Sequence, residues 1–217
     1  TANPQSKAAC NAFQSAQRTW TAIFQQSGQQ FQKPSLQFYG GNGRSGCGAA
    51  QAAMGPFYCP TDQTVYLDLG FWREMETQLG ASGADFARAY VIAHEVGHHV
   101  QDELGILGKV QGRQQNASSK TEANQLSVRV ELMADCLAGV WAKNSNDRWN
   151  ALDQNDIKEA LNAASAIGDD KLQEKSQGYA VPDSFTHGSS EQRMRWFMTG
   201  YRSGQTKSCD TFRPSNN

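Results

Sequence analysis

Two histidines and a glutamate stand at a spacing that could hold a metal ion and activate water. His94 and His98 are four residues apart, and Glu95 directly follows the first of them. On a helix, residues i and i+4 lie on the same face, so both imidazoles can reach one ion. Glu95 leaves that face slightly to one side, where its carboxylate can contact a metal-bound water without being a ligand. The spacing therefore predicts a zinc site of the hydrolytic kind.

The residues around this pattern have the periodicity of a helix. From Ala84 to Leu104, apolar residues recur at spacings of three and four, and Ser82 or Asp85 could begin the helix. A helix here would place both imidazoles as the metal requires. His99 lies about 100° around such a helix from His98, so we expect His99 to pack or cap rather than to bind the ion.

A hydrolytic zinc ion needs a third protein ligand, and its fourth position is left to water. One known helical pattern supplies a glycine three residues and a histidine six residues beyond the second histidine. This chain has Gln101 and Leu104 at those places, so the third ligand must come from elsewhere.

A second predicted helix, from about Glu122 to Lys143, carries two acids on an apolar face, Glu131 and Asp135. Buried carboxylates are costly unless a cation compensates them. We expect Glu131 to bind the metal, with Asp135 one turn away accepting the free ring N–H of a ligating histidine. The two acids could exchange these roles, or Glu122 could be the ligand. An internal salt bridge with Arg129 or another cation would explain the acids without a metal.

Four strings of the sequence resemble a family of bacterial neutral zinc metallopeptidases, whose members are exported or membrane-anchored. They are residues 94–101 (HEVGHHVQ), 129–142 (RVELMADCLAGVWA), 47–72 (CGAAQAAMGPFYCPTDQTVYLDLGFW) and 181–201 (VPDSFTHGSSEQRMRWFMTGY). The similarity extends from about Phe38 to Phe212. It implies a zincin-like fold in which His94, His98 and Glu131 bind zinc. It also implies that Glu95 is the catalytic base and that the substrate is a peptide or protein.

Length and composition are typical of one globular domain: 217 residues, 38% of them hydrophobic and 19% charged. We expect residues 1–37 to form a helix and lead-in before a family-like core at 38–217. A net charge of −1 provides no basic surface for nucleic acid. No run approaches the roughly 18 apolar residues of a membrane span, and the first residues have no targeting segment.

Five cysteines without a CxxC pair argue against a thiolate zinc site. Cys47 and Cys59 flank a short Gly/Ala-rich segment, and we expect them to form a disulfide. Cys209 could pair with Cys136 or with Cys10, which leaves one thiol free. Disulfides indicate an oxidising compartment, so we expect a secreted or cell-envelope protein.

Other segments predict the scaffold around the site. Residues 6–26 read as an amphipathic helix, and 156–167 as a further structural helix. Residues 57–59 and 65–69 read as a β-hairpin. In zincin-like folds a strand at this place borders the cleft, and a peptide can add to it as an extra strand. The polar, Gly-rich residues 105–120 predict a mobile loop.

The fourth histidine, His187, stands alone in a Gly/Ser turn near the C-terminal end. Ser189 and Gln192 make a capping box there, which predicts a helix through Tyr201. His187 could point into the cleft and donate to the oxyanion of a tetrahedral intermediate, or it could only cap or pack locally.

These features together predict an α+β domain of the zincin type, predominantly helical, with a small antiparallel sheet. They predict a zinc metallopeptidase that hydrolyses peptide bonds. A protein with a closed, four-ligand zinc site would instead be an interaction protein without peptidase activity. A cleft without a free strand edge would favour a zinc amidase that acts on a cell-wall-type polymer.

Overall fold

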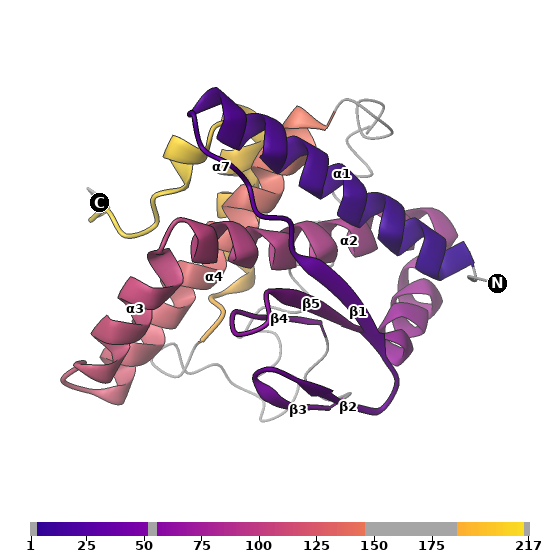
Figure 1. The fold of residues 1–217 in the computed structure, drawn as a ribbon, viewed down its shortest axis with the longest axis horizontal. Coiled ribbons are helices and arrows are strands. Elements are labelled where there is room, and N and C mark those ends of the chain that lie inside the picture. Colours follow the sequence, from indigo (N-terminus) through magenta and orange to yellow (C-terminus); the bar gives the residue numbers. More distant parts are fainter. Residues whose placement is uncertain (1–3, 52–55, 146–185, 215–217) are drawn as a thin grey trace.

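Helices make up most of the described chain, which confirms the predominantly helical α+β prediction. This computed structural model describes residues 4–51, 56–145 and 186–214. Its elements are, in order, α1 (Pro4–Gln26), β1 (Ser35–Tyr39), β2 (Asn42–Ser45), β3 (Gly48–Gln51), β4 (Phe57–Cys59), β5 (Thr64–Asp68), α2 (Leu69–Glu103), α3 (Ile106–Gln115), α4 (Lys120–Asn144), α7 (Ser190–Ser203) and the 3₁₀ helix η4 (Thr206–Cys209). Figure 1 shows their arrangement.

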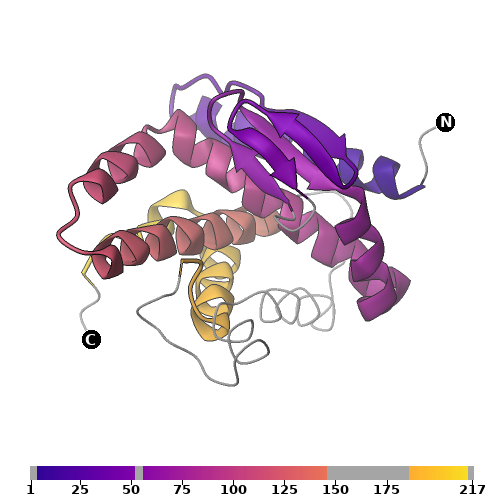
Figure 2. The same ribbon diagram turned by 90° about the horizontal axis from the view of Figure 1, so that it is seen from below.

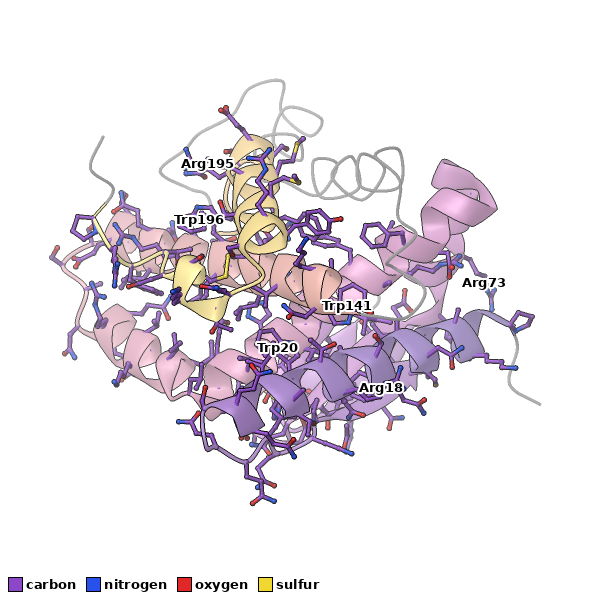
Figure 3. The ribbon with its side chains drawn as sticks, turned by 90° about the horizontal axis from the view of Figure 1, so that it is seen from above. Arg18, Trp20, Arg73, Trp141, Arg195 and Trp196 are labelled. Carbon is purple, nitrogen blue, oxygen red and sulfur yellow. A yellow bond between two sulfur atoms is a disulfide. The ribbon has the colours of Figure 1, made fainter. Side chains whose placement is uncertain are left out.

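Helix α2 is the centre of the fold and packs against α1, α3 and α4. The core between these helices contains large side chains that are completely or almost completely buried, among them Trp20 of α1, Tyr90 of α2 and Trp141 of α4. The Trp141 indole N–H donates to the hydroxyl of Ser15 on α1 at 3.3 Å. Figure 3 shows both tryptophans where α1 and α4 lie close together. Burial of these side chains fixes α2 between its neighbours.

Helices α4 and α7 are in backbone contact. A Cβ added to Gly139 would overlap the carbonyl oxygen of Phe197, and one added to Gly200 would overlap that of Cys136. Only glycine fits at such a crossing, because any side chain would force the helices apart. The close crossing brings the first turns of α7 against the acidic part of α4.

The sheet has the strand order β1-β5-β4 and is mixed. Strands β4 and β5 form the antiparallel hairpin that the sequence predicts, but β1 pairs with β5 in parallel. The expectation of an antiparallel sheet is therefore correct only for the hairpin and for the separate β2–β3 pair. All five residues of β5 are buried, as expected for a central strand, and β5 leads directly into α2. Figure 2 shows the sheet lying against α2.

The prediction of a mobile loop at residues 105–120 is wrong, because α3 occupies most of it. Ile106, Leu107 and Val110 form a short apolar face that packs against Leu126 and Val130 of α4. Glycines at positions 108 and 112 weaken a helix by roughly 1 kcal/mol each, which made the segment resemble a loop. Packing against α4 offsets that cost.

The helix that carries the paired histidines also begins earlier than predicted. It starts at Leu69 directly after β5, not near Ser82 or Asp85. Ser82 and Asp85 are residue types that can begin a helix, but here they lie within one that continues from β5. None of the described helices is long and apolar enough to cross a membrane.

The remaining helix predictions fall into two groups. The helix at residues 6–26 is α1, and the second acidic helix is α4, which begins after the N-cap Ser119. The capping box of Ser189 and Gln192 is present at the start of α7. The helix predicted at 156–167 lies outside the described residues.

Two disulfides are present. Cys47 pairs with Cys59 as predicted, and Cys136 pairs with Cys209, which decides between the two open pairings. Cys10 is a free, partly buried thiol. The Cys136–Cys209 bond attaches η4 to α4, so the C-terminal segment is anchored to the helix that carries the two acids.

The Cys47–Cys59 bond gives a direct stability prediction. Replacing both residues with serine should lower the free energy of unfolding by about 2–3 kcal/mol, because the bond closes a loop with a sequence separation of 12. Urea denaturation of the oxidised protein measures this. The matched control is Cys10→Ser, which breaks no bond and should change stability by less than about 0.5 kcal/mol. Equal stability of the double variant and the wild type would contradict the prediction.

Candidate metal centre

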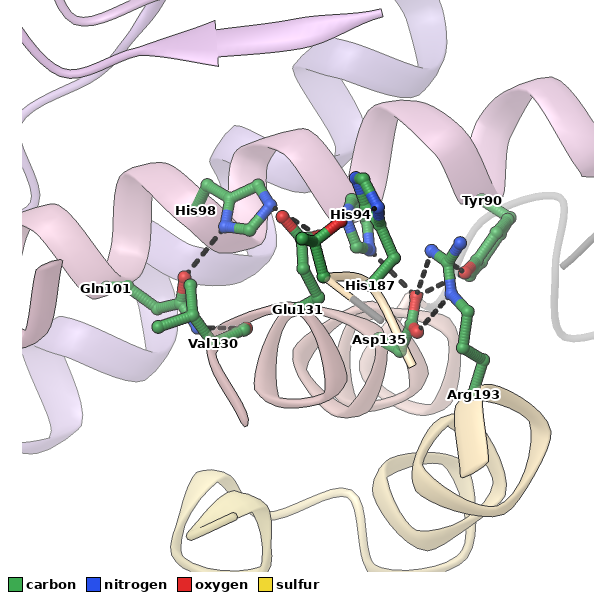
Figure 4. A network of polar contacts seen from close by, with 10 residues as sticks. Tyr90, His94, His98, Gln101, Val130, Glu131, Asp135, His187 and Arg193 are labelled. Carbon is green, nitrogen blue, oxygen red and sulfur yellow. Dashed lines mark hydrogen bonds and ion pairs between the residues drawn. The ribbon is translucent and has the colours of Figure 1, made fainter. Parts of the chain in front are cut away.

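Three predicted ligands meet between α2 and α4. Nε2 of His94 lies 2.9 Å from Oε2 of Glu131, and Nε2 of His98 lies 3.1 Å from the same oxygen. The ligand atoms of all three residues fall within 4.8 Å of one another. Their side chains are only 8%, 12% and 19% exposed, so the group is largely shielded from water. Figure 4 shows both imidazoles turned toward the carboxylate.

The two helices can place these ligands because their backbones come close together at Gly97. A Cβ added there would lie 3.2 Å from the carbonyl oxygen of Ala134, which is tighter than ordinary contact. Gly97 sits between the two histidines in sequence, and Ala134 is three residues after Glu131. A larger residue at 97 would push α4 away and separate Glu131 from the imidazoles.

The donor set fits a zinc ion. Nδ1 of His94 lies 2.8 Å from Oδ1 of Asp135, and a carboxylate accepts but does not donate. Nδ1 of the neutral ring must therefore carry the proton, and Nε2 then presents a lone pair toward Glu131. Lone pairs that face one another repel unless a cation lies between them. Two imidazole nitrogens and one carboxylate oxygen are the protein ligands of many catalytic zinc sites.

The carboxylate beside His94 belongs to a buried polar cluster. Asp135 is completely buried and accepts hydrogen bonds from the guanidinium of Arg193, from Nε at 2.8 Å and from a terminal nitrogen at 3.1 Å. The hydroxyl of Tyr90 also donates to Asp135 and lies 3.3 Å from Arg193. Burial acts to raise the pKa of Asp135, but Arg193 and His94 together more than offset it and hold this pKa at about 2. Asp135 is therefore an anion that can orient His94.

Arg193 is the residue that the sequence reasoning missed. The sequence allows a salt bridge of the acids with Arg129 or another cation; Arg129 donates to the backbone carbonyl of Phe212 at 3.1 Å, and the cation beside Asp135 is Arg193. Arg193 lies 58 residues beyond Asp135 and reaches it only because α7 crosses α4 closely. The sole signal in the sequence is its position in the first turns of a capped helix. Glu131 thus lies against both histidines, whereas Asp135 lies between His94 and the buried cation Arg193.

Glu95 is buried beside the ligand group, with 7% of its surface exposed. Burial raises its pKa, and His94 and His98 act to lower it. A carboxylate with a raised pKa is a stronger base than an exposed one, which suits it to accept a proton from water. Its position directly after His94 on α2 agrees with the proposed approach to a metal-bound water.

His187 lies two residues before Ser189, the N-cap of α7, and is exposed. Its Nδ1 is 3.0 Å from the hydroxyl of Thr186. The next residue, Gly188, has a φ of +96°, and a Cβ added there would lie 3.0 Å from the side chain of Leu132 and 3.4 Å from that of Val128, both on α4. Figure 4 shows His187 among the residues of the polar network, beside His94 and Glu131 in that view. Its role toward an oxyanion stays a prediction.

The other candidates have different surroundings. Glu122 is exposed in the first turn of α4 and accepts from the backbone N–H and the hydroxyl of Ser118, at 2.8 and 2.7 Å, so it stabilises the helix start and is not part of the ligand group. His99 is completely buried, with Nδ1 2.8 Å from the hydroxyl of Tyr58 and Nε2 close to the carbonyl of Gln32. It is a packed histidine, as expected.

Asp135 offers a test of its role toward His94. The variant Asp135→Asn should bind zinc roughly 10- to 100-fold more weakly, because a neutral amide orients and polarises the ring less well than a carboxylate. Competition with a chelator of known affinity measures this. Asp210→Asn is a suitable control, since within the described residues Asp210 pairs with Arg213 and the backbone of Phe212 near the C-terminal end. Unchanged zinc affinity in Asp135→Asn would contradict the assignment.

The fold is that of an α+β protein with a buried group of residues that could hold a metal ion, and comparison with known proteins identifies its family. The family model described as "Putative neutral zinc metallopeptidase" matches residues 2–212. The chain belongs to this family.

Relatives in two distant bacteria support the assignment. YpfJ of Escherichia coli (strain K12) is 57% identical over 194 residues, which cover 89% of this chain and 67% of that protein. Rv2575 of Mycobacterium tuberculosis (strain H37Rv) is 43% identical over 191 residues, which cover 84% of this chain and 63% of that protein. The chain thus spans about two thirds of the length of these relatives, and neither name states an activity. No solved structure matches the chain.

Proposed function

We propose that this chain is a zinc-dependent metallopeptidase that hydrolyses peptide bonds through an activated water molecule. The observation that carries the proposal is the meeting of His94, His98 and Glu131 at one point, with Glu95 buried beside them. Family membership gives independent support, because the family description names zinc and peptidase activity. The described group has three ligand residues, and an open fourth position is what separates catalytic zinc sites from structural ones.

Each residue has a definite part in this reaction. His94, His98 and Glu131 would hold the zinc ion, which when bound lowers the pKa of water toward about 7 and polarises the scissile carbonyl. Glu95 takes a proton from the attacking water and returns it to the leaving amine. Asp135 holds the ring of His94 in the orientation that exposes Nε2. His187 would donate to the oxyanion of the tetrahedral intermediate.

The sheet favours a peptide over a cell-wall-type polymer as substrate. Among the described strands, β4 pairs only with β5, so one of its edges has no strand beside it. Tyr58 of β4 donates to Asp102 of α2 at 2.7 Å, which keeps β4 close to the helix that carries the ligands. An extended peptide can add to such an edge through main-chain hydrogen bonds.

The disulfides bear on where the protein works. Cys47–Cys59 and Cys136–Cys209 are both formed in the structure, and such bonds persist in oxidising compartments. We therefore place the proposed activity outside the cytoplasm, in a secreted or cell-envelope protein. Peptides or exposed protein segments of that compartment would be its substrates.

Two measurements test the proposed function. Elemental analysis of the purified protein should find about one zinc ion per chain. The zinc-loaded protein should then cleave members of a mixed peptide library, as read by mass spectrometry, and a chelator should stop the cleavage until zinc is added back. A protein that holds zinc but cleaves no peptide would refute the peptidase assignment and favour an interaction protein.

A further inference from the structure

We propose that Gln101 is a positioning residue of the metal centre, which fixes the ring of His98 and connects it to the helix that carries Glu131. The proposal rests on the zinc site proposed above, and it adds a residue that the HExxH pattern does not contain. Gln101 occurs three residues after His98, one turn further along α2.

Gln101 is completely buried, and both ends of its amide have partners. Its Nε2 lies 2.8 Å from the backbone carbonyl oxygen of Val130, and its Oε1 lies 2.8 Å from Nδ1 of His98. Figure 4 shows this bridge from the imidazole to α4. A buried amide with a partner at each end is held in one orientation, because turning it round would place the amide oxygen against a carbonyl oxygen.

The partner on α4 determines which way the amide faces. A backbone carbonyl only accepts, so the NH₂ group of Gln101 must point to Val130 and the amide oxygen must point to His98. That oxygen also only accepts, so Nδ1 of His98 must be the donor. In the neutral ring, Nε2 then presents its lone pair to Glu131, 3.1 Å away. The carbonyl of Val130 thereby sets the tautomer of a ligand on another helix.

The side chain of Gln101 also helps to position Glu131, the third proposed ligand. Val130 directly precedes Glu131, so Gln101 holds the backbone beside Glu131 at a fixed distance from the ring of His98. The two histidines are therefore positioned by different chemistry. His94 faces a carboxylate that is paired with Arg193, whereas His98 faces a neutral amide.

The test uses Gln101→Met, which keeps the approximate size of the side chain and removes both hydrogen bonds. Zinc affinity, measured by chelator competition without any substrate, should fall roughly 10- to 100-fold, as it does when such supporting partners are lost. The matched control is Gln114→Met, because Gln114 donates to Ser127 and to the carbonyl of Ala123 but contacts no imidazole. This control should lose hydrogen bonds between α3 and α4 and keep its zinc affinity.

A second measurement follows the hydrogen bond itself. In the zinc-loaded wild type, NMR should show a His98 Nδ1 proton that exchanges slowly with solvent, because Gln101 buries and accepts it. Gln101→Met should make that exchange fast. Gln101→Glu retains an acceptor for the His98 proton but has no N–H for the carbonyl of Val130, so it should keep the proton protected and lose less zinc affinity than the methionine variant. It serves as the test if Gln101→Met does not fold.

Several results would overturn the proposal. They are zinc affinity of Gln101→Met within twofold of the wild type, an equal loss in Gln114→Met, or fast exchange of the His98 proton in the wild type itself. None of these readouts depends on turnover. A protein that binds zinc and shows the expected effects but cleaves no peptide would refute the peptidase assignment and leave the role of Gln101 intact.

Discussion

Glu95→Gln is expected to keep its zinc and to lose about 10²- to 10⁴-fold in the rate of peptide hydrolysis, the range attributed to a general acid or base. Glutamine has nearly the same shape as glutamate but cannot take a proton from water. The ligand atoms of His94, His98 and Glu131 are not altered by the change. Chemistry should therefore be lost while metal binding is retained.

The surroundings of Glu95 explain why the expected loss of rate is large. The side chain is 7% exposed and lies near two imidazoles, so bulk water has little access to replace its carboxylate as the base. Burial also raises the pKa of Glu95, which makes its carboxylate a stronger base toward the proton of the attacking water. The measurement is initial rate on a peptide that the wild type cleaves, with zinc content determined on the same samples.

Glu103→Gln is the matched control for this experiment. It makes the same chemical change near the end of α2, where Glu103 accepts from the backbone of Gln32 at 3.4 Å and lies 3.8 Å from the ring of His99. Its rate should stay within about twofold of the wild type, since it contacts no ligand. Turnover by Glu95→Gln at the wild-type rate would contradict the mechanism, and loss of zinc from that variant would show that Glu95 supports the metal.

The sequence predicted those parts of the site that depend on the spacing of residues within one helix. The i,i+4 spacing of His94 and His98 requires only that α2 be helical, and the apolar periodicity establishes that helix. Glu131 and Asp135 stood out because acids on an apolar face need compensation. The capping box of Ser189 and Gln192 is likewise a local feature, and the structure contains it.

The features that the sequence did not predict depend on contacts between distant segments. Helix α3 is stabilised by packing on α4, which its own glycine-rich sequence does not reveal. The parallel pairing of β1 with β5 joins segments on either side of the β2–β3 hairpin. Gln101 was seen only as the residue that replaces an expected glycine, because its partner Val130 belongs to another helix.

Arg193→Met is expected to lower the free energy of unfolding by about 3–5 kcal/mol, the cost of leaving one member of a buried ion pair uncompensated. Asp135 is completely buried and Arg193 is 3% exposed, so water cannot replace the lost guanidinium. The change also removes a contact to Tyr90 of α2. Urea denaturation of zinc-free protein measures the effect without a contribution from metal binding.

The matched control is Arg195→Met, two residues further along α7. Arg195 is exposed, and Figure 3 shows it on the outer side of the helix. Removing a surface charge should change the free energy of unfolding by less than about 0.5 kcal/mol. The comparison separates the loss of the buried pair from a general effect of methionine on α7.

A double variant identifies the source of the loss. When Asp135→Asn is combined with Arg193→Met, no buried carboxylate remains unpaired, so the pair of changes should cost clearly less than the sum of the single ones. Additive losses of stability would show that the ion pair is not the cause. A loss below about 1 kcal/mol in Arg193→Met would mean that the pair contributes no more than a surface salt bridge does. A large coupling would mean that α7 stabilises the anion on which the orientation of His94 depends.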